Sequence, residues 1–181
     1  MTTPARTTPA RELLLDAFRW TDGHGDIWPA FRDAGTLAAL IRDLVEPFRG
    51  AGITAVCGIE SRGFLLGGAA AVALGAGFAA VRKGDGLFPG EKLTARTQPD
   101  YRGLRHELRL RRSSLGPGDA VLFVDDWIET GSQARAVREL VAAAGARLVG
   151  CAVIVDEVRP DAREGLGTFH ALMTADELPA P

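Results

Sequence analysis

Residues 121–133 combine two adjacent carboxylates with a short polar turn. Four apolar residues lead into Asp125 and Asp126, and Thr130-Gly131-Ser132 then opens a pattern typical of a helix. Backbone N–H groups at the start of a helix bind phosphate, and two neighbouring carboxylates suit the vicinal hydroxyl groups of a sugar. The alternative is an ordinary strand–turn–helix unit whose acids face solvent. The segment predicts a buried strand that ends in the two acids at a site for a sugar phosphate.

The same residues resemble the phosphoribosyl-diphosphate (PRPP) motif of the type I phosphoribosyltransferases. That motif has four hydrophobic residues, two acids, two hydrophobic residues, any residue and then Thr-Gly, and residues 121–131 match it at every position. The resemblance implies that Asp125 and Asp126 bind the ribose hydroxyl groups of PRPP. It also implies a loop that holds the 5-phosphate, made of Glu129, Thr130, Gly131, Ser132 and Gln133.

A second segment, residues 58–63 (GIESRG) followed by Phe64, resembles the pyrophosphate loop of adenine phosphoribosyltransferases. The resemblance implies that Arg62 binds the diphosphate of PRPP through its guanidinium fork, helped by backbone N–H groups at Ser61. Arg82 and Lys83 follow the next predicted strand and would add positive charge against the diphosphate. Mg²⁺ would be held chiefly by PRPP oxygens and water, as this cation prefers, and no protein side chain is assigned to it.

Residues 25–33 (GDIWPAFRD) resemble the loop that binds the base in the adenine enzymes, which ends in Phe-Arg-Asp. Phe31 would stack on a flat ring. Packing in the core is the alternative role for the tryptophans, and Trp127 would point either into the core or towards the base. The residues expected around the base are Trp28, Phe31, Arg32 and Trp127.

Residues 84–104 are rich in Gly, Pro, Lys and Thr and predict an extended loop or flap, at the position of the family's mobile hood. A closing hood would keep water away from an oxocarbenium-like sugar. Asp100 stands near the place of a family acid that reaches the base. Glu129 stands where adenine enzymes carry Ala, and it is either a proton shuttle or an exposed acid without catalytic consequence. The candidate catalytic residues are Glu129, Asp126 and Asp100.

The elements that would position these residues alternate between helix and strand from residue 36 onward. Apolar spacing predicts helices over residues 36–48, 63–74 and 132–144, and strands over residues 53–59, 78–82, 106–110, 120–124 and 148–155. Such alternation is typical of an α/β protein with a central, mainly parallel sheet flanked by helices. Ligands bind at the carboxyl ends of the strands in these sheets. The expected architecture is therefore the type I phosphoribosyltransferase fold with a flexible hood loop.

The composition of the 181 residues restricts the class of protein. An apolar content of 46% is typical of a soluble globular protein, and a net charge of −2 argues against general nucleic-acid binding. Residues 64–81 lack charge, but their glycines and alanines favour a buried helix and strand over a membrane span. Cys57 and Cys151 lie in apolar runs, which indicates reduced thiols and a cytoplasmic protein. Residues 1–11 predict a disordered arm rather than a secretory signal, before one domain over residues 12–181.

The expected function is transfer of the 5-phosphoribosyl group from PRPP to a purine-like base, adenine first, with release of diphosphate. Two alternatives stay open: the same chemistry on an unusual acceptor in specialised metabolism, and a PRPP-binding regulator that does no chemistry. Regulators of this superfamily commonly carry a DNA-binding module, for which residues 1–15 are too short. The resemblance also implies a homodimer.

Overall fold

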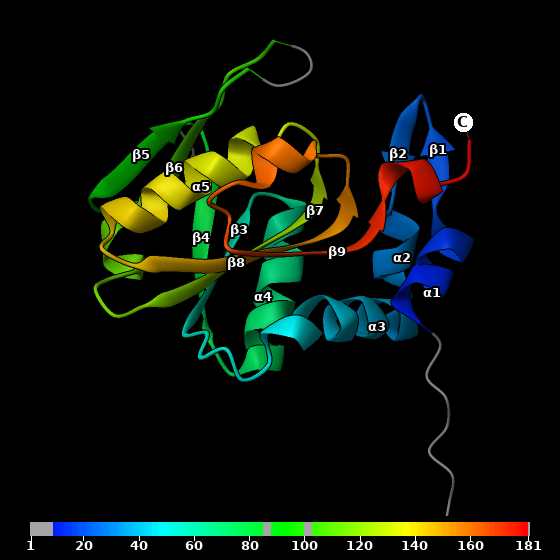
Figure 1. Ribbon diagram of the computed structural model, residues 1–181, viewed down its shortest axis with the longest axis horizontal. Coiled ribbons are helices and arrows are strands. Elements are labelled where there is room, and N and C mark those ends of the chain that lie inside the picture. The colour runs from blue at the N-terminus through cyan, green and yellow to red at the C-terminus, as the bar shows by residue number, and fades with distance from the viewer. Residues whose placement is uncertain (1–8, 85–87, 100–102, 181) are drawn as a thin grey trace, which may run out of the picture.

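The computed structural model describes residues 9–84, 88–99 and 103–180, and its centre is a seven-stranded β-sheet (Figure 1). The strands lie in the order β5-β6-β4-β3-β7-β8-β9. The run from β4 to β9 is parallel, whereas β6 is antiparallel to β4 and β5 is antiparallel to β6. The bounds are Ala55–Ile59 (β3), Gly77–Lys83 (β4), Lys92–Arg96 (β5), Glu107–Arg111 (β6), Ala120–Ile128 (β7), Arg147–Asp156 (β8) and Thr168–Thr174 (β9). This mainly parallel sheet confirms the expected α/β class.

Helices cover both faces of the sheet (Figure 1). One face carries α3 and α4, with α1 and α2 beside α3, and the other face carries α5, which contacts β5 to β8. The helices are α1 (Ala10–Ala17), α2 (Trp28–Arg32), α3 (Ala34–Val45), α4 (Arg62–Leu74) and α5 (Ser132–Ala143). Short 3₁₀ helices are η1 (Glu46–Phe48), η2 (Arg112–Ser114), η3 (Pro160–Arg163) and η4 (Ala175–Glu177).

The apolar run of β7 is continuous because both faces of this central strand are covered. Leu122 and Val124 pack into the cluster below α3 and α4, whereas Val121 and Phe123 pack into the cluster below α5. Successive side chains of a strand point to opposite faces, so a strand buried on both sides needs apolar residues at consecutive positions. Within the described residues, no helix is long and apolar enough to cross a membrane.

The predicted helices and strands are present, with bounds shifted by a few residues, and the largest shift is in β7. The strand was predicted to end at Val124 but continues to Ile128. It does so because β8 stays paired alongside it, through Asp125 with Val153 and Ile128 with Asp156. The two acids therefore lie inside the strand and not after it, which gives their backbone the rigidity of the sheet.

The segment over residues 84–104, predicted as one extended loop, contains the strand β5. Leu93 and Ala95 are buried and alternate with exposed polar residues, which is the pattern of a strand with one buried face. β5 pairs with β6, and α5 packs against it. The prediction of a loop along this whole length was wrong because its Gly, Pro and Lys content masked a five-residue alternation. The flexibility of a hood stays a prediction.

The N-terminal region contains elements that the sequence patterns did not predict. α1 is followed by a hairpin of β1 (Arg19–Thr21) and β2 (His24–Asp26), whose three-residue strands are too short to show periodicity. Of the expected disordered arm, residues 1–8 lie outside the described residues, whereas Ala10 and Arg11 already belong to α1.

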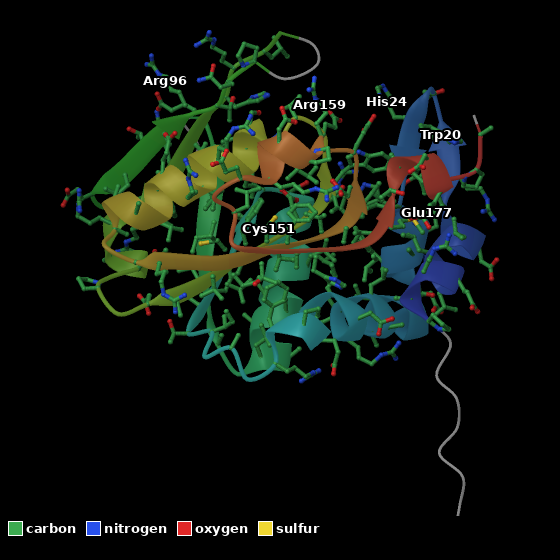
Figure 2. The ribbon with its side chains drawn as sticks, viewed as in Figure 1. Trp20, His24, Arg96, Cys151, Arg159 and Glu177 are labelled. Carbon is green, nitrogen blue, oxygen red and sulfur yellow. The ribbon has the colours of Figure 1, made fainter. Side chains whose placement is uncertain are left out.

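The two ends of the described chain pack together. The indole N–H of Trp20 donates to the carbonyl of Pro179 over 2.7 Å, and Arg11 forms an ion pair of 2.7 Å with Glu177. Figure 2 shows Trp20 and Glu177 on the same side of the molecule, at the N-terminal hairpin. The C-terminal segment is thereby tied to the elements that precede the predicted base loop.

Candidate active site

The carboxyl ends of β3, β4 and β7 bring the three predicted groups of polar residues to one edge of the sheet. β3 lies between β4 and β7 and is parallel to both. Arg62, the first residue of α4, places its Nε 2.9 Å from Oδ2 of Asp126 on β7. The residue predicted to bind the diphosphate and a residue predicted to bind the ribose are therefore in direct contact, although they are far apart in the chain.

The acid pair of β7 is held in a constrained arrangement. The backbone N–H of Asp126 donates to Oδ1 of Asp125 over 3.0 Å. Removal from water, together with the neighbouring negative charge of Asp126, raises the pKa of Asp125 well above its ordinary value. Lys83 lowers this pKa in turn through its positive charge, which indicates that the cation lies near the acid pair.

Asp126 has an oxygen with unused capacity to accept a hydrogen bond. Its side chain is 7% exposed, and Oδ2 receives no hydrogen bond from the described part of the chain. The Arg62 Nε is within 2.9 Å of this oxygen, so their contact is an ion pair whose N–H is not aimed at it. Buried polar atoms are nearly always paired, and an acceptor of this kind suits a sugar hydroxyl group.

The turn between β3 and α4 depends on two glycines. A Cβ on Gly58 would collide with the carbonyl group of Gly63, and a Cβ on Gly63 would lie 3.0 Å from Oδ1 of Asp125. The Glu60–Ser61 peptide bond in this turn is cis. The close approach of the backbone at Gly63 brings the start of α4, and hence Arg62, against the acid pair of β7.

Glu60 connects this turn to the end of β4, and sequence reasoning did not select it as a site residue. Its Oε1 accepts the backbone N–H of Lys83 over 2.6 Å, and its Oε2 accepts Nε–H of Arg82 over 2.9 Å. One carboxylate thus holds the guanidinium of Arg82 and the backbone of Lys83, the two residues of the predicted Arg-Lys pair. The signal available in the sequence was its place inside the GIESRG motif, but its partners lie 22 and 23 positions away.

The predicted phosphate loop joins β7 to α5 and contains a left-handed turn at Gly131. Gly131 has φ of 70°, a conformation that favours glycine. The backbone N–H of Ser132 donates to the hydroxyl of Thr130 over 3.3 Å, and Ser132 is buried. Gln133 is half-buried and Glu129 is exposed. The loop thus places small residues and backbone N–H groups at the first turn of α5, as anion binding requires.

The predicted base residues lie on and beside α2. Phe31 is buried and Trp28 is 49% exposed, and their rings meet edge to face with centroids 5.6 Å apart. Arg32 is exposed at the end of the helix. Asp33 caps α3 by accepting the backbone N–H of Thr36 over 2.8 Å, and this hydrogen bond is the main cause that lowers its pKa.

Trp127 packs against the hairpin that leads into the base loop. A Cβ on Gly25 would lie 3.0 Å from Cζ3 of Trp127 and 3.2 Å from Cε2 of Phe18. The indole N–H of Trp127 donates to Oε2 of Glu157 over 3.0 Å. Of the two roles considered for this residue, the structure shows the packing role. Contact with a base stays a prediction.

Two further predictions concern Asp100 and a metal site. Asp100, predicted as a catalytic residue in the hood, lies outside the described residues. Within residues 9–84, 88–99 and 103–180, no group of three or more His, Cys, Asp or Glu could hold a metal ion.

Comparison with known proteins gives one consistent result. The family model for the phosphoribosyl transferase domain matches residues 28–165. Adenine phosphoribosyltransferase of Methylococcus capsulatus is 41% identical over 145 residues, which cover 80% of this chain and 81% of the relative. The crystal structure of adenine phosphoribosyltransferase from Rhodothermus marinus has a TM-score of 0.81 and 36% identity, and covers 91% of this chain and 98% of its own. The Saccharomyces cerevisiae enzyme, solved with adenine and an imino-altritol bisphosphate, has a TM-score of 0.75 at 31% identity, over 90% of this chain and 98% of its own.

Proposed function

The chain belongs to the phosphoribosyltransferase family, and from this premise we propose that it transfers the 5-phosphoribosyl group of PRPP to adenine and releases diphosphate. The observation that carries the proposal is the contact between Arg62 and Asp126, which joins the cationic turn to the acid pair at the carboxyl edge of the sheet. Relatives and solved structures named as adenine phosphoribosyltransferases support adenine as the acceptor.

Each part of PRPP has a matching group of residues in this proposal. Asp125 and Asp126 bind the ribose hydroxyl groups, and Oδ2 of Asp126 is a buried acceptor suited to one of them. The loop from Glu129 to Gln133 binds the 5-phosphate through backbone N–H groups and the hydroxyls of Thr130 and Ser132. Arg62 and Lys83 bind the diphosphate, and Glu60 holds the backbone of Lys83 and the guanidinium of Arg82 at the end of β4.

In the reaction, the bond from C1 of the ribose to a diphosphate oxygen breaks, and C1 forms a bond to a ring nitrogen of adenine on the opposite face. Positive charge develops on the sugar ring and negative charge on the leaving diphosphate. The carboxylates of Asp125 and Asp126 stabilise the positive charge on the sugar ring. Arg62 and Lys83 stabilise the negative charge on the leaving diphosphate. Positioning and prearranged charge supply most of the acceleration in such a scheme.

The attacking nitrogen of adenine gives up a proton. Glu129 is the candidate acceptor in the phosphate loop, because it is an exposed acid that follows the acid pair of β7 in the chain. Asp100 is the second candidate, carried by the hood. A carboxylate next to a bound phosphate is unfavourable unless it faces away from that phosphate, and this role requires Glu129 to face the base.

Mg²⁺ bound to PRPP would neutralise part of the diphosphate charge and so improve the leaving group. This chain would hold that ion through the oxygens of PRPP and through water, which fits the preference of Mg²⁺ for oxygen ligands and retained water. Lys83 and Arg62 share the neutralisation of the same diphosphate from the protein side.

The proposal also covers the cellular compartment, the domain and the oligomeric state. We assign the chain to the cytoplasm, because its two cysteines, Cys57 and Cys151, are free thiols buried in apolar strands and disulfides are typical of oxidising compartments. We also assign residues 12–181 to one domain and the enzyme to a homodimer, as the family resemblance implies. Sedimentation velocity at micromolar concentration tests the dimer, and a single species with the mass of one chain would contradict it.

The activity is tested with a panel of bases incubated with PRPP and Mg²⁺ and scored for release of diphosphate. We expect release with adenine, and much less with hypoxanthine or guanine. Release with another base alone would favour an unusual acceptor. Binding of PRPP without release for any base would favour a regulator and would overturn the enzymatic role.

The role of the acid pair is tested by Asp126→Asn, which removes the charge and keeps the shape. Hydrogen bonds to charged groups contribute roughly 1.5–3 kcal/mol, so kcat/KM for PRPP should fall by about 10- to 150-fold. Asp119→Asn is the matched control, because Asp119 precedes the same strand at its opposite end and accepts the hydroxyl of Thr54. Near-normal turnover of Asp126→Asn would refute the assignment to the ribose.

A further inference from the structure

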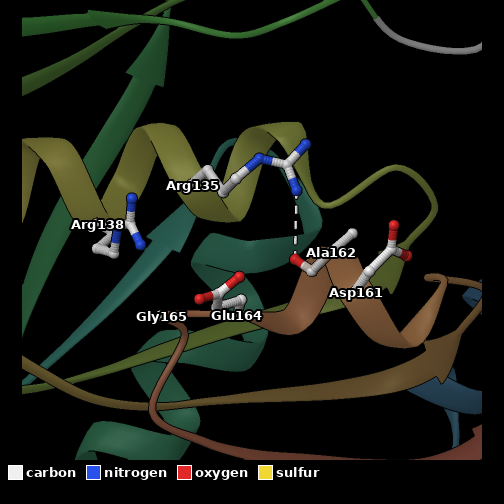
Figure 3. A pocket seen from close by; sticks show the side chains of 6 residues that line it. All are labelled: Arg135, Arg138, Asp161, Ala162, Glu164 and Gly165. Carbon is white, nitrogen blue, oxygen red and sulfur yellow. Dashed lines mark hydrogen bonds between the residues drawn. The ribbon is translucent and has the colours of Figure 1, made fainter.

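Arg135, on the first turn of α5, reaches back under the phosphate loop. Its Nη2 donates to the carbonyl of Thr130 over 3.0 Å, and its Nη1 donates to the carbonyl of Ala162 on η3 over 3.2 Å. Figure 3 shows the guanidinium extended from α5 towards Ala162. One side chain thereby connects the phosphate loop to a segment that follows β8.

The guanidinium of Arg135 lies directly against Gly131, where the chain turns into the left-handed region. A Cβ on Gly131 would lie 3.0 Å from Nη1 of Arg135 and 3.2 Å from the carbonyl oxygen of Ala162. The space behind the loop is therefore filled by the guanidinium and by η3. Gly131 has a φ of 70° and no side chain of its own. The orientation of the Thr130–Gly131 peptide therefore depends on the hydrogen bond that Arg135 donates to the Thr130 carbonyl.

Because the peptide bond is planar, the hydrogen bond from Arg135 to the Thr130 carbonyl also fixes the direction of the Gly131 N–H. In a trans peptide, the C=O of Thr130 and the N–H of Gly131 point in opposite directions. When Arg135 holds the carbonyl towards η3, the N–H of Gly131 faces away from η3. If this peptide turned over, the carbonyl oxygen would face the site of the 5-phosphate and repel it.

We propose that Arg135 is a positioning residue that fixes the Thr130–Gly131 peptide, so that the N–H of Gly131 binds the 5-phosphate of PRPP. The inference rests on the proposed function, since it assigns the 5-phosphate to this loop. Arg135 does not touch the substrate; it acts through the backbone of the loop, and its guanidinium matches two carbonyl oxygens at once.

Arg138, one turn further along α5, provides a matched comparison. Arg135 and Arg138 both line a surface cavity of ≈ 430 Å³ together with Asp161, Ala162, Glu164 and Gly165 (Figure 3). The guanidinium of Arg138 packs on Gly165, and among the hydrogen bonds of the described residues it is Arg135 that donates to the phosphate loop. The two arginines share a charge and an environment but differ in the contact with Thr130.

The test compares Arg135→Met, Arg135→Lys and Arg138→Met. Binding of ribose 5-phosphate is measured by calorimetry, and KM values for PRPP and adenine are measured with the complete enzyme. Arg135→Met should weaken ribose 5-phosphate binding and raise KM for PRPP by about tenfold, with KM for adenine and kcat changed less than about twofold. Arg135→Lys should be intermediate, because one ammonium group satisfies one carbonyl at a time. Arg138→Met should match the unchanged protein.

Other outcomes overturn the inference. Unchanged affinity for ribose 5-phosphate in Arg135→Met would exclude the positioning role. Full recovery in Arg135→Lys, or an equal loss in Arg138→Met, would show that the arginine acts through charge alone. If Arg135→Met does not fold, Arg135→Lys decides, because a loss of at least about threefold is expected of it. Failure of the unchanged protein to bind ribose 5-phosphate would sink the proposed function itself, which separates the two failures.

Discussion

At the scale of single residues, the acid pair Asp125 and Asp126 is arranged to bind the ribose but lowers the stability of the folded protein. Asp125 is an acid whose pKa is raised by burial and by the charge of Asp126. Residues that are arranged for a ligand often carry such an electrostatic cost. A folded protein with a raised acid pKa binds the proton more tightly than the unfolded chain does. Its free energy of unfolding therefore falls as pH rises from the ordinary carboxyl pKa to the raised pKa of Asp125.

We therefore predict that Asp125→Asn raises the melting temperature at pH 7, while turnover falls. The gain should shrink as pH is lowered towards the ordinary carboxyl pKa, because Asp125 is then protonated in the folded protein and its charge no longer opposes folding. Thermal unfolding between pH 4 and pH 8 measures the difference. The prediction fails if the variant is less stable than the unchanged protein at pH 7, or if the gain does not depend on pH.

At the scale of elements, Trp127 links two parts of the site that are distant in the chain. It belongs to β7, its ring packs over Gly25 of the N-terminal hairpin, and Glu157 after β8 accepts its indole N–H. The hairpin leads directly into α2, where Trp28 and Phe31 lie. This packing contact therefore helps to set the position of the base loop relative to the PRPP motif.

Gly25→Ala tests that dependence, because the added Cβ would meet Trp127 at 3.0 Å. Overpacking of this kind costs typically about 1–3 kcal/mol, and we expect KM for adenine to rise more than KM for PRPP. The effect should diminish when Trp127→Leu is present in the same chain, which a double-mutant cycle measures.

Gly68→Ala is the control for Gly25→Ala, since a Cβ at this position on α4 would meet nothing within 4 Å. It should leave both KM values unchanged and stabilise the helix by roughly 0.5–1 kcal/mol. An equal rise of both KM values in Gly25→Ala would show general damage and would contradict a link specific to the base loop.

At the scale of the whole molecule, the two ends of the chain close the structure. Arg11 on α1 pairs with Glu177 on η4, and the same carboxylate accepts both the backbone N–H and the hydroxyl of Thr174. The pKa of Glu177 is lowered, chiefly by the backbone hydrogen bond of Thr174. This contribution to stability is present above the ordinary carboxyl pKa and is lost as pH falls through the lowered value.

We predict that Glu177→Ala is more destabilising than Arg11→Ala. Arg11→Ala removes an exposed ion pair and should cost below about 1 kcal/mol, whereas Glu177→Ala also removes the capping box of η4 and should cost about 1 kcal/mol more. Denaturant unfolding at pH 7 and pH 4 measures both, and the difference should narrow at the lower pH. Equal effects would show that the cap contributes nothing.

The sequence by itself determined the sheet, its main helices and the two loops expected to bind PRPP. These features follow from short-range order: apolar periodicity in residues 36–155, and motifs in which neighbours such as Asp125, Asp126 and Thr130 act together. The family follows from the same motifs, because an acid pair and a phosphate turn on one strand and helix need no distant partner to be recognised.

Only the tertiary structure decided which distant residues meet at this edge of the sheet. Glu60, after β3, binds Arg82 and Lys83 at the end of the neighbouring strand β4. Arg135 binds the carbonyl of Ala162, and β5 forms because β6 and α5 cover it. The direction of Trp127 was decided by Gly25, whose missing side chain leaves the space that the ring fills. Such contacts depend on packing between elements far apart in the chain, so local sequence patterns do not predict them. The thirteen-residue motif therefore identifies the chemistry, and the fold sets its geometry.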